Sequence, residues 1–472
     1  MAQRQGQNRQ QAMLFPLLLD ELVPADSLVR VIDAWVGSLD LVALGFKKAV
    51  PQIMGAPSYG AGDLLRLYVW GNANAVRSSR RLEDACHRDV ECMWLLGRLA
   101  PDHKTISEFR RTNLPSLVAA CAGFVQFARQ QGVLRPKAVA IDGTKLRARS
   151  SRSRLAGENK LRELLQQNMA EVQAYMELLE ANDQDEDGRA ARCSPEAAQR
   201  ALRKLQDEGA QLQQCLQQIL QERRSAAVVG EPEARPMKGL HGTPGYNVQA
   251  AVDTQTHLVV HSDVCTDGND RNQLAPMAMG AAAALGEAVA VVADTGYSNG
   301  HQLHELHAQG IDAAVPAHPK TNTRGLLGHE AFTYEPGSDR YVCPQGKLLP
   351  YLKTNQNGML VYAAKPTQCG RCPMKAQCTT SKQRHVTRHP QQADLDRAQR
   401  RWVEDGALRR QRSSTVEHVW GTLKTGTLLG GKLLLRGLQG ARAEVALAVL
   451  AYNIKRMLNI KDANWMMRAL QA

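Results

Sequence analysis

The stretch from Arg409 to Lys424, which reads RRQRSSTVEHVWGTLK, decides how the rest of the chain is interpreted. Its four apolar residues recur at helical spacing and predict a helix with one apolar stripe: Val416, Val419, Trp420 and Leu423. Glu417 and Lys424 are seven residues apart, about two helical turns, so we expect them on one face with the arginine run. An acid held among cations can bind a metal ion beside phosphates. A surface helix with an ordinary mixture of charges is the alternative.

Length and composition restrict the class of protein. The chain has 472 residues, more than the roughly 250 to 300 residues of one hydrophobic core, so we expect two or three domains. The formal charge of +13 indicates a polyanionic partner, nucleic acid rather than membrane. No stretch is apolar for long enough to span a membrane and no leader is recognisable, so we expect a cytoplasmic protein. The ten cysteines should then be reduced, and clustered cysteines indicate metal ligands.

The first 132 residues divide into a tail and a helical region. Residues 1–12 are polar and predicted to be disordered, and residues 13–132 are predicted to form a helical domain. Ser27 should begin one helix, and Thr105 with Glu108 has the form of a capping box that opens another at Ile106. Several arginines lie in this region, so it is either a DNA-binding module or a helical bundle with a solvated basic face.

Two apolar, strand-like runs each end in an acid and a glycine turn. The first leads to Asp142-Gly143, and the second leads to Asp294, two residues before Gly296. Open α/β sheets carry their sites at strand ends, so these acids are candidates for one site; an ordinary Asp-Gly turn is the alternative for the first. Three acids that meet raise one another's pKa unless a cation lies between them, and Mg²⁺ is the simplest such cation.

Two segments interrupt the sheet pattern. Residues 151–239 are rich in Leu, Gln, Glu, Arg and Ala and predict two long helices in a hairpin, with an acidic break at residues 182–188 that is a solvated turn. Residues 326–390 contain short strands and four clustered cysteines with knuckle spacing: Cys343, Cys369, Cys372 and Cys378. They suit a structural Zn²⁺, with His385 as a substitute ligand and unrelated buried thiols as the alternative.

These motifs together resemble a known family. The stretches Ile141–Thr144, Ala293–Ser298 and Thr415–Lys424 are similar to the three acid-bearing motifs of bacterial insertion-sequence transposases with an RNase H-like DDE catalytic domain. Tyr59–Arg111 resembles the helical N-terminal domain of the same elements. The family pairs its catalytic Glu with a Lys seven residues later, as Lys424 does here. It also has an Arg four residues before the Glu, where this chain has Ser413 and Arg412 lies one step away.

The resemblance implies roles for individual residues. Asp142, Asp294 and Glu417 would hold two Mg²⁺ ions, or Mn²⁺, and cleave and join DNA strands by two-metal phosphoryl transfer. The partner would be double-stranded DNA, both element ends and target, bound by a homodimer on paired ends. The candidate DNA-contacting residues are Lys424, Arg412, Arg410, Tyr297 and Lys145, with a core position as the alternative for Tyr297. Between Arg384 and Arg436, eleven Lys or Arg face five Asp or Glu, which suits a phosphate track.

The sequence therefore predicts an α/β protein. Its RNase H-like mixed sheet, flanked by helices, would comprise residues 133–150, 240–325 and 391–472, with the helical hairpin, a zinc-ribbon-like β insertion and the all-α N-terminal domain added. The predicted function is DNA cleavage at insertion-sequence ends followed by strand transfer. Two alternatives stay open: a metal-dependent DNA nuclease without strand transfer, and a non-catalytic DNA-binding regulator derived from a transposase. Three intact acids argue against the regulator, because DNA binding alone does not favour buried carboxylates.

Overall fold

The computed structural model describes residues 18–50, 57–184, 195–318, 325–425 and 429–471. The tail predicted to be disordered, residues 1–12, lies outside the described residues, as do residues 185–188 of the acidic break.

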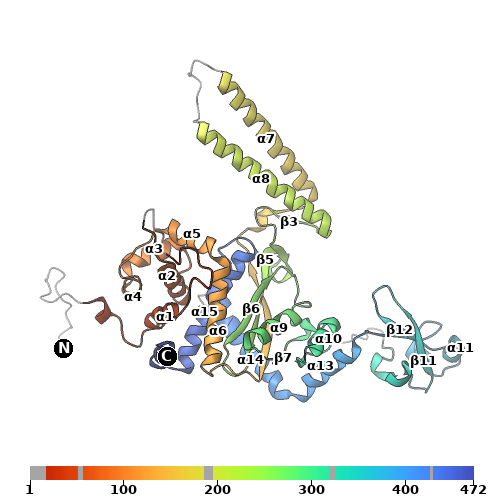
Figure 1. Cartoon of the computed structure of the whole chain (residues 1–472). Coiled ribbons are helices and arrows are strands. Elements are labelled where there is room, and N and C mark those ends of the chain that lie inside the picture. The colour runs from red at the N-terminus through yellow and green to blue at the C-terminus, as the bar shows by residue number, and fades with distance from the viewer. Residues whose placement is uncertain (1–17, 51–56, 185–194, 319–324, 426–428, 472) are drawn as a thin grey trace, which may run out of the picture.

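A mixed sheet of six strands forms the centre of the molecule (Figure 1). The strands are β1 (Ala138–Arg147), β4 (Arg235–Met237), β5 (Thr243–Asp253), β6 (Val259–Cys265), β7 (Ala290–Val292) and β8 (Ala313–Ala314). β1 pairs antiparallel with β5 and parallel with β7, and β7 continues parallel to β8. β5 also pairs antiparallel with β4 and with β6, so the long antiparallel strands lie on one side of β1 and the short parallel ones on the other.

β1 does not end at its acid as the sequence predicted. It continues without a turn through Gly143 to Arg147, and Asp142 pairs with Ala250 of β5. Side chains alternate across the strand. Ile141 therefore joins the main core on one face, whereas Ala140, on the other face, packs with Val292 and Val416. Asp142 follows Ala140 on this second face.

Helices cover both faces of the sheet. α9 (Leu274–Leu285) and α15 (Leu438–Ile460) pack on the first face, and α14 (Gly406–Trp420) packs on the second face through Val416. α10 (Gly300–Ala308) and α13 (Gln392–Glu404) contact each other, and α13 also contacts β8. The chain ends with α16 (Ala463–Gln471), which packs on the first helix.

The N-terminal region is helical as predicted. Its helices are α1 (Leu28–Gly37), α2 (Ala61–Ala73), α3 (Ser79–Arg88), α4 (Val90–Leu95), α5 (His103–Thr112) and α6 (Leu114–Gln130). α6 and α2 pack on α15, so one continuous apolar core runs from these helices into the sheet (Figure 1). A buried ion pair between Arg77 and Glu444 of α15 joins the same two parts of the chain.

Two helix starts show how well the capping signals predicted local structure. Ser27 caps α1 by accepting from the Val29 N–H, as expected. The predicted capping box at Thr105 is wrong, because α5 begins earlier and Asp102 is its cap, accepting from the Thr105 N–H at 2.7 Å. Thr105 is therefore a donor in the first turn. An aspartate is as good a cap as a threonine, so the competing signal three residues upstream prevailed.

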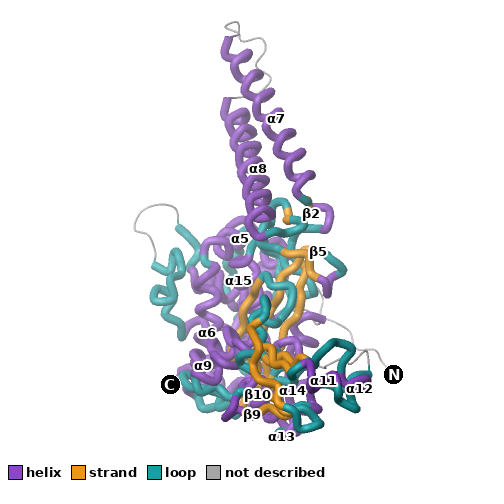
Figure 2. The backbone as a smooth tube through the Cα atoms, turned by 90° about the vertical axis from the view of Figure 1, so that its right-hand side faces the viewer, coloured by secondary structure: helices purple, strands orange, loops and turns teal. Residues whose placement is uncertain are grey.

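A helical hairpin projects from the sheet, as Figures 1 and 2 both show. It consists of α7 (Glu158–Gln184) and α8 (Pro195–Glu222), with a two-stranded sheet of β2 (Leu155–Ala156) and β3 (Ala227–Val228) at its base. Leu161, Leu212 and Ile219 are buried in a small core at this base. The hairpin leaves the central sheet after β1 and returns to it at β4.

A second sheet of five antiparallel strands follows β8. Its strands are β9 (Thr333–Glu335), β10 (Arg340–Val342), β11 (Leu348–Thr354), β12 (Leu360–Ala363) and β13 (His385–Arg388), with the short helices α11 (Pro366–Gly370) and α12 (Lys375–Cys378). We call it the distal sheet. Its small core is built on Tyr341, Tyr362 and Phe332. Within the described part of the chain, no helix is long and apolar enough to cross a membrane.

Candidate active site

Asp142 and Asp294 meet at the centre of the mixed sheet. Asp142 lies in β1, and Asp294 follows β7 and caps the short turn η4 (Thr295–Tyr297), where it accepts from the Gly296 N–H at 2.8 Å. Arg412 of α14 lies between them. Its Nη2 is 3.2 Å from Asp142 Oδ1 and 3.3 Å from Asp294 Oδ2. The structure therefore brings together two of the three predicted acids, and one cation serves both.

The acid pair is poorly solvated on the Asp142 side. The Asp142 side chain is 21% exposed and that of Asp294 46%. Burial raises the pKa of Asp142 to about 6; Arg412 and the Gly143 N–H lower it, and the charges of Asp294 and Asp270 raise it again. Burial therefore outweighs the one guanidinium, and a stronger cation would be needed to keep Asp142 fully ionised.

Arg412 is the arginine that reaches the acids. Its side chain is 15% exposed, whereas Ser413, at the position where the family usually has its arginine, is exposed to solvent. Among the described residues, the buried Nε of Arg412 has no acceptor. The hydrogen bonds of the Arg412 guanidinium are those that Nη2 donates to the two acids. Arg410 is exposed and remains accessible to a partner.

Glu417 does not join the pair in this arrangement. It is exposed on α14, and its carboxylate forms no hydrogen bond or ion pair with any described residue. Its neighbour Val416 is buried against Ala140 and Val292, on the face of the sheet that carries Asp142. The helix is thus fixed over the acid pair while Glu417 itself points into solvent.

Lys424 lies on the same face of the sheet as Asp142, although the regular helical spacing that the sequence predicted does not place it there. α14 ends at Trp420 and is followed by one π-helical turn, η7 (Gly421–Thr425), so the regular spacing between Glu417 and Lys424 is broken. The Lys424 Nζ donates to Thr144 Oγ1 at 3.1 Å. Thr144 is two residues after Asp142, on the same side of β1. Single π turns inside helices often occur at functional sites.

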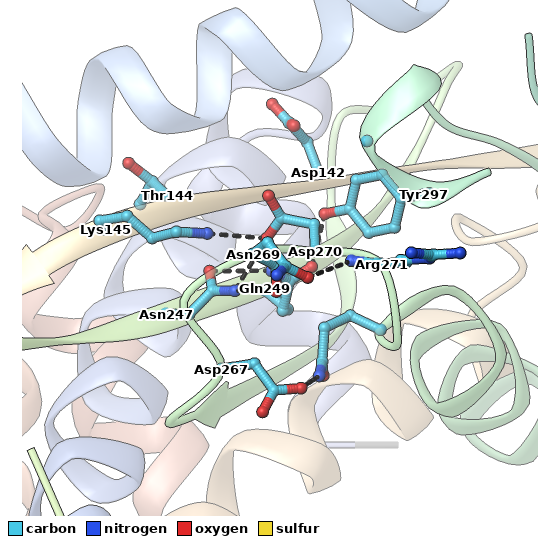
Figure 3. A network of polar contacts seen from close by, with 12 residues as sticks. Asp142, Thr144, Lys145, Asn247, Gln249, Asp267, Asn269, Asp270, Arg271 and Tyr297 are labelled. Atoms are coloured by element: carbon cyan, nitrogen blue, oxygen red, sulfur yellow. Dashed lines mark hydrogen bonds and ion pairs between the residues drawn. The ribbon is translucent and has the colours of Figure 1, made fainter. Parts of the chain in front are cut away.

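A network of polar side chains lies on the opposite side of β1 (Figure 3). Asp270, in the loop between β6 and α9, pairs with Lys145 at 2.9 Å and accepts from Gln249 at 2.7 Å. Tyr297 is 1% exposed, and its hydroxyl donates to Gln249 Oε1 at 2.5 Å. Lys145 and Tyr297, both predicted to contact DNA, are thus engaged within the protein, and the alternative of a core position describes Tyr297.

The network contains residues that the sequence did not single out. Asn247 and Gln249 are polar side chains in the buried strand β5, and both are fully buried. Polar residues within a strand that the sequence predicts to be buried were a usable signal. A buried polar side chain needs hydrogen-bond partners, so it predicts a polar network nearby. Asp270 stood out only as one of several polar residues in a loop.

The four clustered cysteines lie around the distal sheet. Cys343, Cys369 and Cys378 pack against the same small core of that sheet. Burial raises the pKa of Cys378, Arg384 lowers it, and the charges of Cys369, Cys343 and Cys372 raise it again. The Lys347 N–H donates to Cys343 Sγ at 3.3 Å. His385, the predicted substitute ligand, begins β13.

The positions of the described acids, histidines and cysteines indicate which of them suit a metal ion. Among the residues that the structure describes, no three His, Cys, Asp or Glu side chains are arranged to hold one metal ion. The pair of Asp142 and Asp294 does fit a divalent cation, because a cationic nitrogen already lies within 3.3 Å of an oxygen from each. Carboxylate oxygens are also the ligands that Mg²⁺ prefers.

Comparison with known proteins gives the class. Residues 342–458 match the family described as Transposase DDE domain, and residues 17–112 match the Transposase domain (DUF772). The first match includes Glu417 and Lys424 but neither Asp142 nor Asp294. Both matches are to transposase families, and each covers only a part of the chain. More particularly, the two matches confirm its resemblance to insertion-sequence transposases of the DDE type, which the motifs had suggested.

Two further comparisons add little. A cryo-EM structure of a piggyBac transposase synaptic complex with hairpin DNA is similar at 8% identity and a TM-score of 0.30, covering 96% of this chain and 78% of the other. No curated protein matches the chain.

Proposed function

We propose that this chain is a transposase that cleaves DNA at the ends of an insertion sequence and transfers the cut strand to a target by phosphoryl transfer at Asp142, Asp294 and Glu417. One observation carries the proposal: two carboxylates from neighbouring strands share a single cation beneath the helix that bears Glu417. Two carboxylates held this close together, one of them largely buried, suit a divalent cation.

The acids would bind Mg²⁺, two ions in all, or Mn²⁺. When bound, the ions would stabilise the negative charge on the attacking and leaving oxygens of the phosphodiester. Asp142 and Asp294 would hold them from the sheet, and Glu417 would turn inward from α14 as the third acid. Val416 already fixes α14 against β1 and β7. The triad would therefore be completed by side-chain movements alone: Glu417 would turn towards the two aspartates, and Arg412 would leave them.

Double-stranded DNA is the proposed partner, bound by a homodimer on paired ends. The net charge of +13 and the basic run from Arg384 to Arg436 support a phosphate-binding surface. Arg412, once displaced from the acids, and the exposed Arg410 would contact phosphates. Lys424 would do the same from the π turn next to Thr144.

Two structural assignments belong to the same proposal. The mixed sheet, with β1 between antiparallel and parallel neighbours, supports the RNase H-like assignment of the catalytic domain. The proximity of four thiols around the distal sheet supports a structural Zn²⁺ held by Cys343, Cys369, Cys372 and Cys378. The thiols would have to close around the ion from their described positions.

The test is cleavage of element-end DNA with Mg²⁺, comparing the natural protein with Glu417→Ala and with the control Glu404→Ala. Glu404 is also an exposed acid, at the end of α13, away from the acid pair. We expect Glu417→Ala to stop nicking while end binding persists, and Glu404→Ala to leave both unchanged. Nicking by Glu417→Ala at the natural rate would remove Glu417 from the site.

The products separate the proposal from its alternatives. A transposase joins the cut end to target DNA, so joined products should accompany nicked ones. Nicking without joined products would favour the nuclease. Binding of ends with no Mg²⁺-dependent product from any variant would favour the regulator.

A further inference from the structure

One carboxylate oxygen of Asp270 accepts from three donors, on the side of β1 opposite to Asp142 (Figure 3). Its Oδ1 accepts from Lys145 Nζ at 2.9 Å, from Asn247 Nδ2 at 2.8 Å and from Gln249 Nε2 at 2.7 Å. Lys145 belongs to β1, and the two amides belong to β5. A single loop residue therefore links the strand that carries Asp142 to the neighbouring strand.

Gln249 extends the link to the second acid. Its amide nitrogen donates to Asn247 Oδ1 and to Asp270, and its amide oxygen accepts from the Tyr297 hydroxyl. Tyr297 is buried and ends the turn that Asp294 begins. The hydrogen bond from Tyr297 to Gln249 therefore connects the turn that begins at Asp294 to β5.

Gly143 shows how closely this network approaches β1. A Cβ atom at Gly143 would lie 2.2 Å from Gln249 Nε2 and 2.8 Å from Asp270 Oδ1. A side chain there would displace the Gln249 amide, so the glycine that follows Asp142 leaves room for the network and does not form a turn. The backbone next to Asp142 therefore rests directly on the Asp270–Gln249 pair.

We propose that Asp270 is a positioning residue, which sets the separation of the Asp142 and Asp294 carboxylates through Lys145, Gln249 and Tyr297. The inference rests on the proposed function, in which those two acids hold the divalent cation. Asp270 does not touch the cation itself, because it lies on the far side of β1 from Asp142. Hydrogen bonds of this largely buried network hold its members in one arrangement, and we expect the loss of one bond to loosen the separation of the two acids.

The network can be perturbed with two matched pairs of variants. Tyr297→Phe removes one hydroxyl, and its control Tyr68→Phe removes another buried hydroxyl, which donates to the Ile106 carbonyl in the N-terminal helices. Asp270→Asn removes the charge opposite Lys145, and its control Asp267→Asn changes an acid of the same loop that contacts Gln273.

The measurement is Mn²⁺ binding to the full chain without DNA, followed by electron paramagnetic resonance, together with the thermal midpoint. One lost hydrogen bond should raise the Mn²⁺ dissociation constant about threefold to tenfold in Tyr297→Phe and in Asp270→Asn. The controls should bind Mn²⁺ as the natural protein does. A merely structural role would lower the thermal midpoint of Tyr297→Phe and Tyr68→Phe alike, and leave Mn²⁺ affinity unchanged.

Asp142→Ala distinguishes a failure of the proposed metal site from a failure of the proposed role of Asp270. If the natural protein binds Mn²⁺ and Asp142→Ala does not, the acids hold the cation, and unchanged affinity in both network variants then overturns the role of Asp270. If Asp142→Ala binds Mn²⁺ as well as the natural protein, the proposed metal site is wrong and the inference falls with it.

Discussion

The ionised Asp142 carboxylate should weaken the folded state of the metal-free protein, so Asp142→Asn should stabilise it at neutral pH. Burial raises the pKa of Asp142 from 3.8 to about 6. Each pKa unit corresponds to about 1.4 kcal/mol, so the free energy of unfolding should be lower by about 3 kcal/mol when the group is ionised. Asparagine keeps the shape of the side chain and carries no charge.

The sign follows from proton binding. The folded protein binds the Asp142 proton more tightly than the unfolded chain does, so this group lowers stability as pH rises from about 4 to about 6. Above pH 6 the full difference between Asp142→Asn and the natural protein should be present. Towards pH 4 the difference should vanish, because both side chains are then neutral.

Urea unfolding of both proteins in EDTA, from about pH 3 to about pH 8, measures this difference. Asp339→Asn provides a control of opposite sign, because hydrogen bonds from Tyr362 and Tyr334 lower the pKa of Asp339. Asp339→Asn should therefore destabilise the protein at pH 7 and lose its effect as pH falls through the acid range. A stability difference for Asp142→Asn that is negative, or independent of pH, would refute the reasoning.

Further predictions concern residues around the site. Gly143→Ala should destabilise the protein by about 1–3 kcal/mol in urea unfolding, because the added Cβ would displace Gln249; a neutral result would contradict the close packing. Glu444→Ala should lower the free energy of unfolding by about 3 kcal/mol, because it leaves Arg77 buried without its partner acid; an effect below about 1 kcal/mol would show that this pair does not fasten the N-terminal helices. Cys372→Ser should reduce the Zn²⁺ content measured by atomic absorption, and zinc-free natural protein would exclude the structural zinc.

Periodicity predicted much of the fold because local chemistry determines it. Continuous apolar runs located the strand that holds Asp142 and the strand that precedes Asp294, and the 3.6-residue spacing located the helices of the hairpin and α14. The end of β1 was predicted wrongly. Asp-Gly favours a turn locally, but here the glycine lies within a strand because side chains from β5 and a distant loop press against it. No local pattern records such a contact.

The site was predicted only in part, because several of its contacts depend on the tertiary structure and not on a local pattern. The spacing of Glu417 and Lys424 assumed an unbroken α-helix, whereas a π turn begins at Gly421. The arginine between the acids is Arg412, and its selection over Arg410 depends on how α14 is rotated against the sheet. Asp270 acquires its place from the tertiary fold alone, since it is far in sequence from Lys145 and Gln249.

Charge balance gives a reason why Glu417 lies apart from the acid pair. Two carboxylates with one guanidinium leave a single uncompensated negative charge, and a third carboxylate at the same place would double it. Under the proposed function, two divalent cations carry four positive charges, which match three carboxylates and one phosphodiester. Glu417 then has reason to turn inward only when both metal and DNA are present, and Arg412 becomes free for a phosphate at that moment. Arg412 thus occupies the acid pair as a counter-ion while Glu417 remains in solvent, and the substrate itself supplies the charge that completes the site.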